Sequence, residues 1–169
     1  MKLLVLNGAS CSGKSTIIKN IMKEKEGYFH LSYDSLKWQF SKYVSGKYYK
    51  DIHIIMLSIL DAVCKLKHNV ICEAYHRESR EKLISLAKEY GYQIIEINLE
   101  ADFEVLSERF EQRVSEALAN PEKRVANRTI ERFTELFDIY QKEKNPSAII
   151  FRTDTKSIKE VSDAVIALL

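Results

Sequence analysis

Short apolar runs alternate with longer amphipathic segments along the whole chain. The runs that we predict to be strands are 3–6, 28–33, 70–72, 93–99 and 148–151. Each is followed by a segment whose apolar residues recur with the spacing of one helical face, as at Ile52, Met56 and Val63. Such alternation is typical of right-handed βαβ units. The pattern therefore predicts an α/β fold, with five parallel strands covered by helices on both faces.

Length and composition narrow this picture to one domain of long helices with short connections. The chain has 169 residues, which suits a single domain spanning 1–169. Only 5 residues are glycine and 2 are proline, while 46% are apolar, so a disordered, collagen-like or many-stranded β protein is excluded. Two of the five glycines, Gly8 and Gly13, fall within eight residues. That concentration directs the search for function to the end of the first strand, where sheets of this kind bind ligands.

Charge and cysteine content exclude several classes of protein. Lysine and arginine number 26 and the acidic residues 24, so we expect no extended nucleic-acid binding. No apolar run approaches the roughly 18 residues of a membrane span, or the roughly 7–15 of a secretion signal. The three cysteines do not have the number or spacing of a disulfide framework, which suits a reducing compartment. We therefore expect a cytoplasmic protein with no membrane partner and, because no histidine–cysteine cluster occurs, no structural metal.

The segment after the first strand has the spacing G-x-x-x-x-G-K-S, the Walker A pattern. Its glycines let successive backbone N–H groups face one anion, and the helix that follows adds its positive end. Lys14 is expected to reach the β- and γ-phosphates of ATP, and Ser15 to ligate Mg²⁺. The residues expected to bind the nucleotide are Gly8, Ala9, Ser10, Cys11, Ser12, Gly13, Lys14, Ser15 and Thr16. For Cys11, a small filler in the loop and a redox-active thiol are both open.

Asp34 follows the second strand, near where a γ-phosphate would point. A carboxylate there can accept the proton of an attacking hydroxyl or align that hydroxyl. Alternatively, Asp34 caps a helix that begins at Ser35 or Leu36. We expect a catalytic or substrate-orienting role, and the two roles can coexist.

Aromatic residues and lysines are concentrated between positions 28 and 49, where eight of the seventeen aromatic residues lie. Trp38 is the first candidate among them for contact with the phosphate acceptor. Such rings could hold a base or another flat, anionic acceptor. They could equally be the packed face of a helix with amphipathic tyrosines.

The third strand ends at Glu73, followed closely by Arg77 and Arg80. Glu73 is expected to hold a water on Mg²⁺ or to orient the acceptor, and a helix-start carboxylate is the alternative. The two arginines could bind oxygens of the acceptor or of phosphate. They could equally form surface pairs with Glu73, Glu78 or Glu81.

Arginines recur every four residues in the region after the fourth strand. Arg109 and Arg113 share one helical face, and Arg124, Arg128 and Arg132 repeat the spacing. Arginines that close over ATP can neutralise charge in the transition state, so we expect a lid at about 109–128 in which Arg109 and Arg113 act catalytically. For Arg124, Arg128 and Arg132, pairing with neighbouring glutamates is at least as good an interpretation.

With these residues placed, the chain resembles the compact P-loop kinases of the AAA_33 type. These include polynucleotide 5′-hydroxyl kinases, chloramphenicol phosphotransferase, zeta-type toxins, and gluconate and shikimate kinases. The resemblance extends over nearly the whole chain, to a segment at 151–155 that is similar to the one that contacts adenine in these kinases. It implies a three-layer fold with strand order 2-3-1-4-5. Two departures are Glu73, where aspartate is common, and Trp38, where polynucleotide kinases have an arginine nearby.

The resemblance and the motifs together predict an ATP- and Mg²⁺-dependent kinase. The expected acceptor is a hydroxyl or phosphate group of a nucleoside, a nucleotide or a nucleic-acid 5′ end. Two alternatives remain at this point. One is a kinase of a small non-nucleotide metabolite or antibiotic, and the other is a P-loop ATPase or nucleotide-dependent switch without phosphotransfer.

Overall fold

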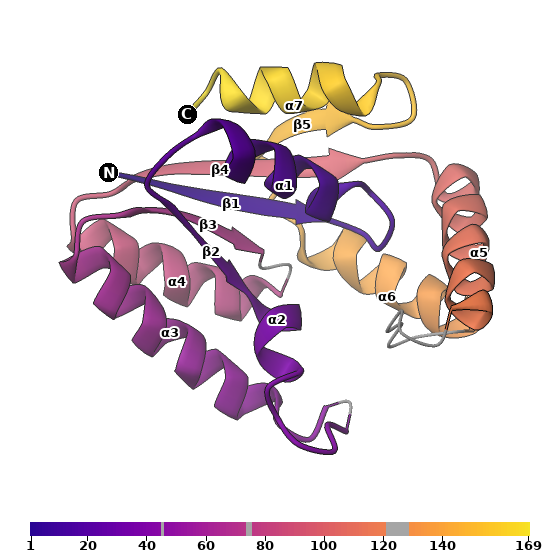
Figure 1. Cartoon of the computed structure of the whole chain (residues 1–169), viewed down its shortest axis with the longest axis horizontal. Helices are drawn as coiled ribbons and strands as arrows, with labels where there is room; N and C mark the ends of the chain where they lie inside the picture. The colour runs from indigo at the N-terminus through magenta and orange to yellow at the C-terminus, as the bar shows by residue number, and fades with distance from the viewer. Residues whose placement is uncertain (45, 74–75, 121–128) are drawn as a thin grey trace.

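The computed structural model describes residues 1–44, 46–73, 76–120 and 129–169, and its centre is a five-stranded parallel sheet (Figure 1). The strand order is β2-β3-β1-β4-β5, as the resemblance implied. The strands are β1 Lys2–Gly8, β2 Tyr28–Ser32, β3 Asn69–Glu73, β4 Gln93–Glu100 and β5 Ile149–Arg152. The predicted α/β fold with five parallel strands is confirmed.

Helices cover both faces of the sheet, with α1 and α7 on one face and α3, α4 and α6 on the other (Figure 1). The described helices are α1 Lys14–Glu24, α2 Tyr33–Lys37, α3 Tyr49–Lys65, α4 Arg77–Glu89, α5 Phe103–Ala119, α6 Ile130–Glu143 and α7 Ile158–Ile166. Each strand side chain points to the face opposite that of its neighbour, so a central strand needs apolar residues at almost every position. This is why the strands read as nearly continuous apolar runs.

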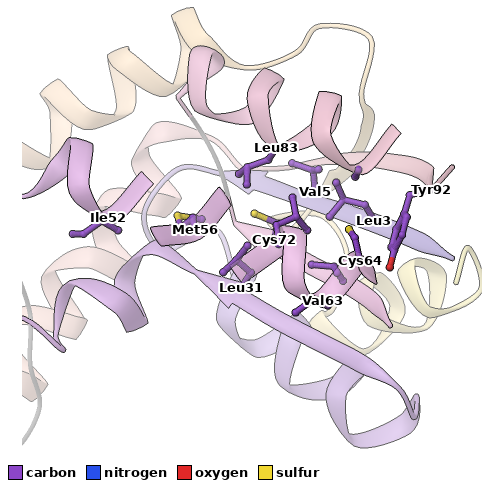
Figure 2. Close-up of a cluster of buried hydrophobic side chains, with 13 residues drawn as sticks. Leu3, Val5, Leu31, Ile52, Met56, Val63, Cys64, Cys72, Leu83 and Tyr92 are labelled. Atoms are coloured by element: carbon purple, nitrogen blue, oxygen red, sulfur yellow. The ribbon is translucent and has the colours of Figure 1, made fainter. Parts of the chain in front are cut away.

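Alternation along β1 divides the core into two layers. Leu3 and Val5 join the cluster under α3 and α4, part of which Figure 2 shows. Leu4 and Leu6 join the cluster under α1 and α7. A third cluster lies between α5 and α6, where the Phe110 and Phe133 rings stack with centroids 4.6 Å apart. The third cluster fixes α5 and α6 beyond the carboxyl ends of the strands, where the predicted site lies.

Two helices begin with serine caps. The N-cap of α2 is Ser32, whose Oγ accepts a hydrogen bond from the Ser35 N–H, so the alternative role of Asp34 as the cap of this helix is wrong. The last helix begins at Ile158 with a capping box formed by Ser157 and Glu160. In both cases the chosen cap is a serine, a residue type that competes well with aspartate for helix N-termini.

The described residues of the aromatic segment, 28–44 and 46–49, form a strand, a short helix, turns and the start of α3 rather than one packed helix. Phe40 stacks on Tyr48 with ring centroids 4.7 Å apart, and Trp38 contacts Tyr43 edge-on.

None of the described helices has the length and apolar character needed to cross a bilayer.

Candidate active site

A cavity of about 670 Å³ opens where β1, β2 and β3 end. The order of the strands explains why distant residues meet there, since Gly8, Ser32 and Glu73 end three neighbouring parallel strands. The predicted residues that line the cavity are Gly8, Ala9, Ser10, Cys11, Ser12, Gly13, Lys14, Ser15, Thr16, Asp34, Trp38, Glu73, Arg109 and Arg113. The structure therefore brings together the phosphate loop, both candidate carboxylates and the first two arginines of the predicted lid.

The loop between β1 and α1 depends on its two glycines. A Cβ on Gly8 would lie 2.3 Å from Ser12 Oγ and 2.8 Å from the Leu99 carbonyl oxygen. Gly13, the N-cap of α1, has φ 92°, in the left-handed region that glycine adopts without strain. The first turn of α1 contains no acidic residue. The positive end of the helix therefore remains available to an anion such as phosphate.

The side chain of Lys14 reaches back to the start of its own loop. Its Nζ donates to the carbonyl oxygens of Gly8 at 2.7 Å and of Ala9 at 2.9 Å. Burial lowers the pKa of this ammonium below its usual value, and the nearby carboxylates of Glu73 and Asp34 oppose that shift. The loop thus holds a cation beside two acidic side chains, at the place where the terminal phosphates of a nucleotide are expected.

Glu73 and Asp34 differ in their surroundings. Burial raises the pKa of the Glu73 carboxyl, but the hydrogen bond from His30 Nε2 (3.1 Å) and the charge of Lys14 outweigh burial, so the net pKa is lowered. Asp34 Oδ1 accepts from Lys37 Nζ at 2.5 Å, and its side chain is 74% exposed. Glu73 is therefore a fixed, ionised group, whereas Asp34 is open to the cavity.

The oxygen donors in the cavity suit Mg²⁺. Ser15, Asp34 and Glu73 all line it, and they offer a hydroxyl and two carboxylates. Mg²⁺ prefers oxygen ligands and keeps several waters, and it commonly uses one or two carboxylates together with phosphates. Within the described residues no group of three or more histidine, cysteine or acidic side chains could enclose a metal by itself. The residues present fit an ion held jointly with a nucleotide.

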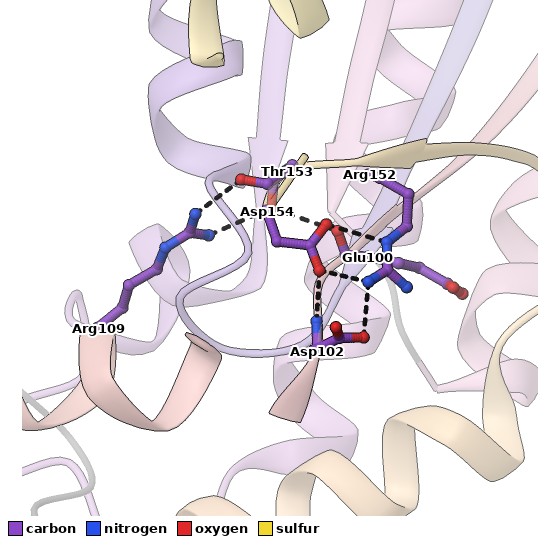
Figure 3. A network of polar contacts seen from close by, with 6 residues as sticks. All are labelled: Glu100, Asp102, Arg109, Arg152, Thr153 and Asp154. Atoms are coloured by element: carbon purple, nitrogen blue, oxygen red, sulfur yellow. Dashed lines mark hydrogen bonds and ion pairs between the residues drawn. The ribbon is translucent and has the colours of Figure 1, made fainter. Parts of the chain in front are cut away.

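Arg109 connects three segments that are far apart in the sequence, and Figure 3 shows its hydrogen bonds to Thr153. Its Nη1 donates to the Cys11 carbonyl at 3.4 Å and to Thr153 Oγ1 at 3.2 Å, and its Nη2 donates to the Thr153 carbonyl at 2.7 Å. Arg109 thereby ties α5 to the phosphate loop and to the residues after β5. The contact with Cys11 is to its backbone, so its side chain takes no part in it.

Arg113 and Arg132 also line the cavity, although Arg132 lies beyond the predicted lid. Arg132 Nη1 donates to Glu135 Oε2, which is a pairing with a neighbouring glutamate of the kind considered above. Arg124 and Arg128 lie outside the described residues. Of the predicted lid, the structure therefore places Arg109 and Arg113 at the cavity.

A second network in Figure 3 fixes the segment after β5. Arg152 donates to Asp154 and, at 2.6 Å, to Asp102 Oδ1. The Asp102 N–H in turn donates to Asp154 Oδ2 at 2.8 Å. The hydrogen bonds from Arg152 lower the pKa of Asp154 to about 2. Asp154 thereby joins the ends of β4 and β5.

Arg77 and Arg80, for which acceptor binding and surface pairing were both open, do not line the cavity. Arg77 Nη2 donates to the Lys142 carbonyl and Arg80 Nη1 to the Glu143 carbonyl, both at 2.9 Å. The buried Arg80 also pairs with Glu96 at 3.5 Å. Because the last carbonyls of a helix lack partners within it, these arginines satisfy the end of α6. They join α4 to α6.

Other lining residues include His53, His76 and Ser79, for which the sequence predicts no contact with the acceptor, and Tyr49, the last ring of the aromatic segment 28–49. Tyr49 and His53 come from the first turns of α3, and His76 and Ser79 from the start of α4. The spacing of the histidines excludes a metal cluster and by itself indicates no other role. The i, i+4 spacing of Tyr49 and His53 was the available signal, since it places both side chains on one helical face.

One family model, described as an AAA domain and designated AAA_33, matches residues 3–155. The chain belongs to this family. Its resemblance to P-loop kinases extends to solved structures. A candidate kinase from Chloroflexus aurantiacus is 15% identical, with a TM-score of 0.71 over 99% of this chain and 98% of that one. No curated protein sequence matches this chain.

Two other solved structures named as kinases share this fold. The APS kinase CysC of Mycobacterium tuberculosis is 18% identical, with a TM-score of 0.64 over 99% of this chain and 96% of that one. The shikimate kinase of Aquifex aeolicus is 17% identical, with a TM-score of 0.60 over 99% and 95% of the two chains. This AAA_33 protein therefore has a P-loop kinase-like fold.

Proposed function

We propose that this protein is an ATP-dependent kinase that transfers the γ-phosphoryl group to an acceptor. The observation that carries the proposal is one cavity that joins a phosphate-binding loop, the Lys14 ammonium, the exposed carboxylate of Asp34 and the guanidinium of Arg113. Phosphoryl transfer needs positioning and charge stabilisation more than covalent chemistry, and these groups supply both. The acceptors we favour are nucleosides, nucleotides and nucleic-acid 5′ ends.

The roles of the protein groups follow from their positions. The backbone N–H groups of loop 8–15 and the start of α1 would bind the phosphates, with Lys14 at the terminal ones. Asp34 would take the proton of an attacking hydroxyl as the new oxygen–phosphorus bond forms and the bond from the γ-phosphorus to the ADP oxygen breaks. Arg113 would stabilise the negative charge of the transferring group. Arg109 would keep α5, which carries Arg113, against the loop.

Ser15 and Glu73 would hold Mg²⁺ together with the phosphates, and the ion would supply charge neutralisation there. The hydrogen bond from His30 keeps the Glu73 carboxylate oriented toward the cavity. We also place the protein in the cytoplasm, since its three free cysteines suit a reducing compartment.

The proposal is tested by two substitutions in purified protein. Lys14→Ala removes the cation at the terminal phosphates, and a single such electrostatic group accounts for about 10²–10³-fold in kcat. Asp34→Asn removes the base, and we expect kcat to fall by about 10²–10⁴-fold while the Kd for ATP changes little. Asp138→Asn, at an exposed position of α6, is the matched control and should leave both quantities unchanged.

The measurement is ADP release with and without a panel of acceptors. Acceptor-dependent release that disappears in Lys14→Ala supports the kinase. Steady hydrolysis that is independent of every acceptor would instead identify an ATPase or a nucleotide-dependent switch. Full transfer activity in Lys14→Ala would refute the assignment.

A further inference from the structure

The wall of the cavity formed by α3 and the start of α4 consists of neutral, mostly ring-bearing side chains. The Tyr49 ring lies 4.4 Å from the His53 ring and 5.3 Å from the His76 ring, centroid to centroid. Ser79 Oγ lies 3.1 Å from His53 Nε2 and 3.3 Å from the Tyr49 hydroxyl. All four residues line the cavity. We call them the ring wall.

The ring wall stands next to the candidate base. The Tyr33 ring lies 5.9 Å from that of Tyr49 and 5.4 Å from that of His53. Tyr33 directly precedes Asp34 in α2, and both line the same cavity. A molecule that rests against the wall is therefore close to Asp34, which is where a phosphate acceptor must present its hydroxyl.

Charge is distributed unevenly over the cavity. Within the described part of the lining, Lys14 belongs to the phosphate loop, and the arginines belong to α5 and α6. The remaining cation, Lys37, is paired with Asp34 at 2.5 Å. The ring wall contains no lysine or arginine. Burial lowers the pKa of both His53 and His76 below the ordinary value of a histidine, which favours the neutral imidazole.

This distribution discriminates between acceptors. A phosphate or carboxylate placed against the ring wall would lose its hydration without meeting a cation, which is unfavourable. An uncharged ring gains contact with aromatic faces, and its polar edge can exchange hydrogen bonds with Ser79, His53 and the Tyr49 hydroxyl. Trp38 lines the same cavity and is 37% exposed, but Lys37 Nζ lies 5.1 Å from its ring centroid, so Trp38 is not part of this cation-free wall.

We propose that the acceptor is an uncharged hydroxyl compound built on a flat ring, held by the ring wall with its hydroxyl toward Asp34. A nucleoside or an aromatic alcohol fits this description, whereas a nucleotide, a nucleic-acid end or a carboxylated sugar does not. The inference rests on the proposed kinase function and narrows its substrate. In the reaction the hydroxyl loses its proton to Asp34 and gains the γ-phosphoryl group of ATP, and ADP leaves.

Matched pairs of acceptors test the charge requirement. Uridine and uridine 3′-monophosphate share a free 5′-hydroxyl and differ by one phosphate. In the same way, 4-methylbenzyl alcohol and 4-(hydroxymethyl)benzoate differ by one carboxylate. In each pair of which at least one member is phosphorylated, we expect kcat/KM to be at least about tenfold higher for the uncharged member. Equal or higher kcat/KM for the charged members would overturn the inference and leave the kinase assignment intact.

Binding provides a second readout that does not need turnover. Trp38 is the sole tryptophan of the chain and lines the cavity, so its fluorescence should report acceptor binding in the presence of a saturating non-hydrolysable ATP analogue. We expect saturable changes with the uncharged compounds at concentrations at least tenfold below those needed for the charged ones. Binding without transfer to any acceptor would refute the kinase function alone. Absence of binding by both uncharged compounds would count against the ring-wall inference.

Substitutions at Tyr49 test the wall itself. Tyr49→Leu removes the ring and should raise KM for the acceptor by roughly tenfold while KM for ATP stays constant. Tyr49→Phe keeps the ring and should restore most of the affinity. Tyr90→Leu, at a tyrosine that contacts Asp61 on the outer surface, is the matched control and should change neither constant. If Tyr49→Leu and wild type have the same KM for the acceptor, or if both KM values rise together, the ring wall does not hold the acceptor.

Discussion

Gly8 shows how a single atom controls the candidate site. Its missing Cβ leaves room for the hydroxyl of Ser12, which is fully buried, and for the carbonyl of Leu99 on the neighbouring strand. The carbonyl belongs to β4 and cannot move without disturbing the centre of the sheet. The loop is therefore shaped by close packing as well as by its backbone angles.

Gly8→Ala should distort the phosphate loop. Crowding of this kind costs about 1–3 kcal/mol of stability, and we expect the Kd for ATP to rise by at least tenfold. Gly91→Ala is a useful comparison, since Gly91 has φ 74° but nothing lies within 4 Å of the position that a Cβ would take there. The two variants separate crowding from backbone strain. Equal effects of both on ATP affinity, measured by calorimetry, would contradict this account.

At the scale of elements, side chains at helix and strand ends connect the parts of the molecule. Glu143, at the end of α6, accepts a hydrogen bond from the first N–H of α4 at 2.7 Å, and Arg80 of α4 reaches back to the Glu143 carbonyl. Arg109 and Arg152 make similar connections beyond β4 and β5. These contacts set where α5 and α6 stand relative to the phosphate loop.

The Arg152–Asp154 contact predicts a specific dependence of stability on pH. The pKa of Asp154 is about 2 in the folded protein against 3.8 for an unperturbed aspartate, so its stabilising effect is complete above pH 3.8. The effect disappears as the pH falls through about 2, where the folded-state carboxyl binds its proton.

Asp154→Asn should therefore lower the free energy of unfolding at pH 7, and the difference from wild type should shrink between pH 4 and pH 2. Urea titrations at several pH values measure both curves. Asp163→Asn removes an exposed i, i+4 pair with Lys159 and serves as the control with little expected effect. A difference between wild type and Asp154→Asn that is constant over this pH range would contradict the assignment.

At the scale of the whole molecule, the sheet joins three apolar clusters into one structure. The clusters beneath the helices share the strands of the sheet, and the third, between α5 and α6, includes Ala9 of the phosphate loop. We propose on this basis that residues 1–169 form one cooperative domain.

A single unfolding transition is expected, and a nucleotide should raise its midpoint. A ligand at 100 times its Kd stabilises the folded state by about 2.7 kcal/mol, and each kcal/mol shifts the melting temperature by roughly 2–4 °C for a protein of this size. Calorimetry with a non-hydrolysable ATP analogue measures both quantities. Two separate transitions, of which only one responds to the analogue, would contradict the single domain.

The sequence alone determined the elements and the phosphate loop. Strand runs such as 93–99 and helical faces such as that of Ile52 and Met56 are local patterns, and local patterns fix the type of an element. Gly8, Gly13 and Lys14 are recognisable because the loop's chemistry depends on spacing within eight residues. Helix ends were less certain, because several neighbouring residues can serve as caps, as Ser32 does in place of Asp34.

Only the tertiary structure decided which distant side chains meet. The hydrogen bond of His30 to Glu73, the role of Arg80 at the end of α6 and the contacts of Tyr49 with His53, His76 and Ser79 join different elements. Helix packing and strand order place these groups, and neither leaves a signature in the spacing of any one segment. The local sequence pattern around an arginine is the same whether its side chain binds a ligand or a helix end. The partner of the arginine is therefore known only from the folded structure.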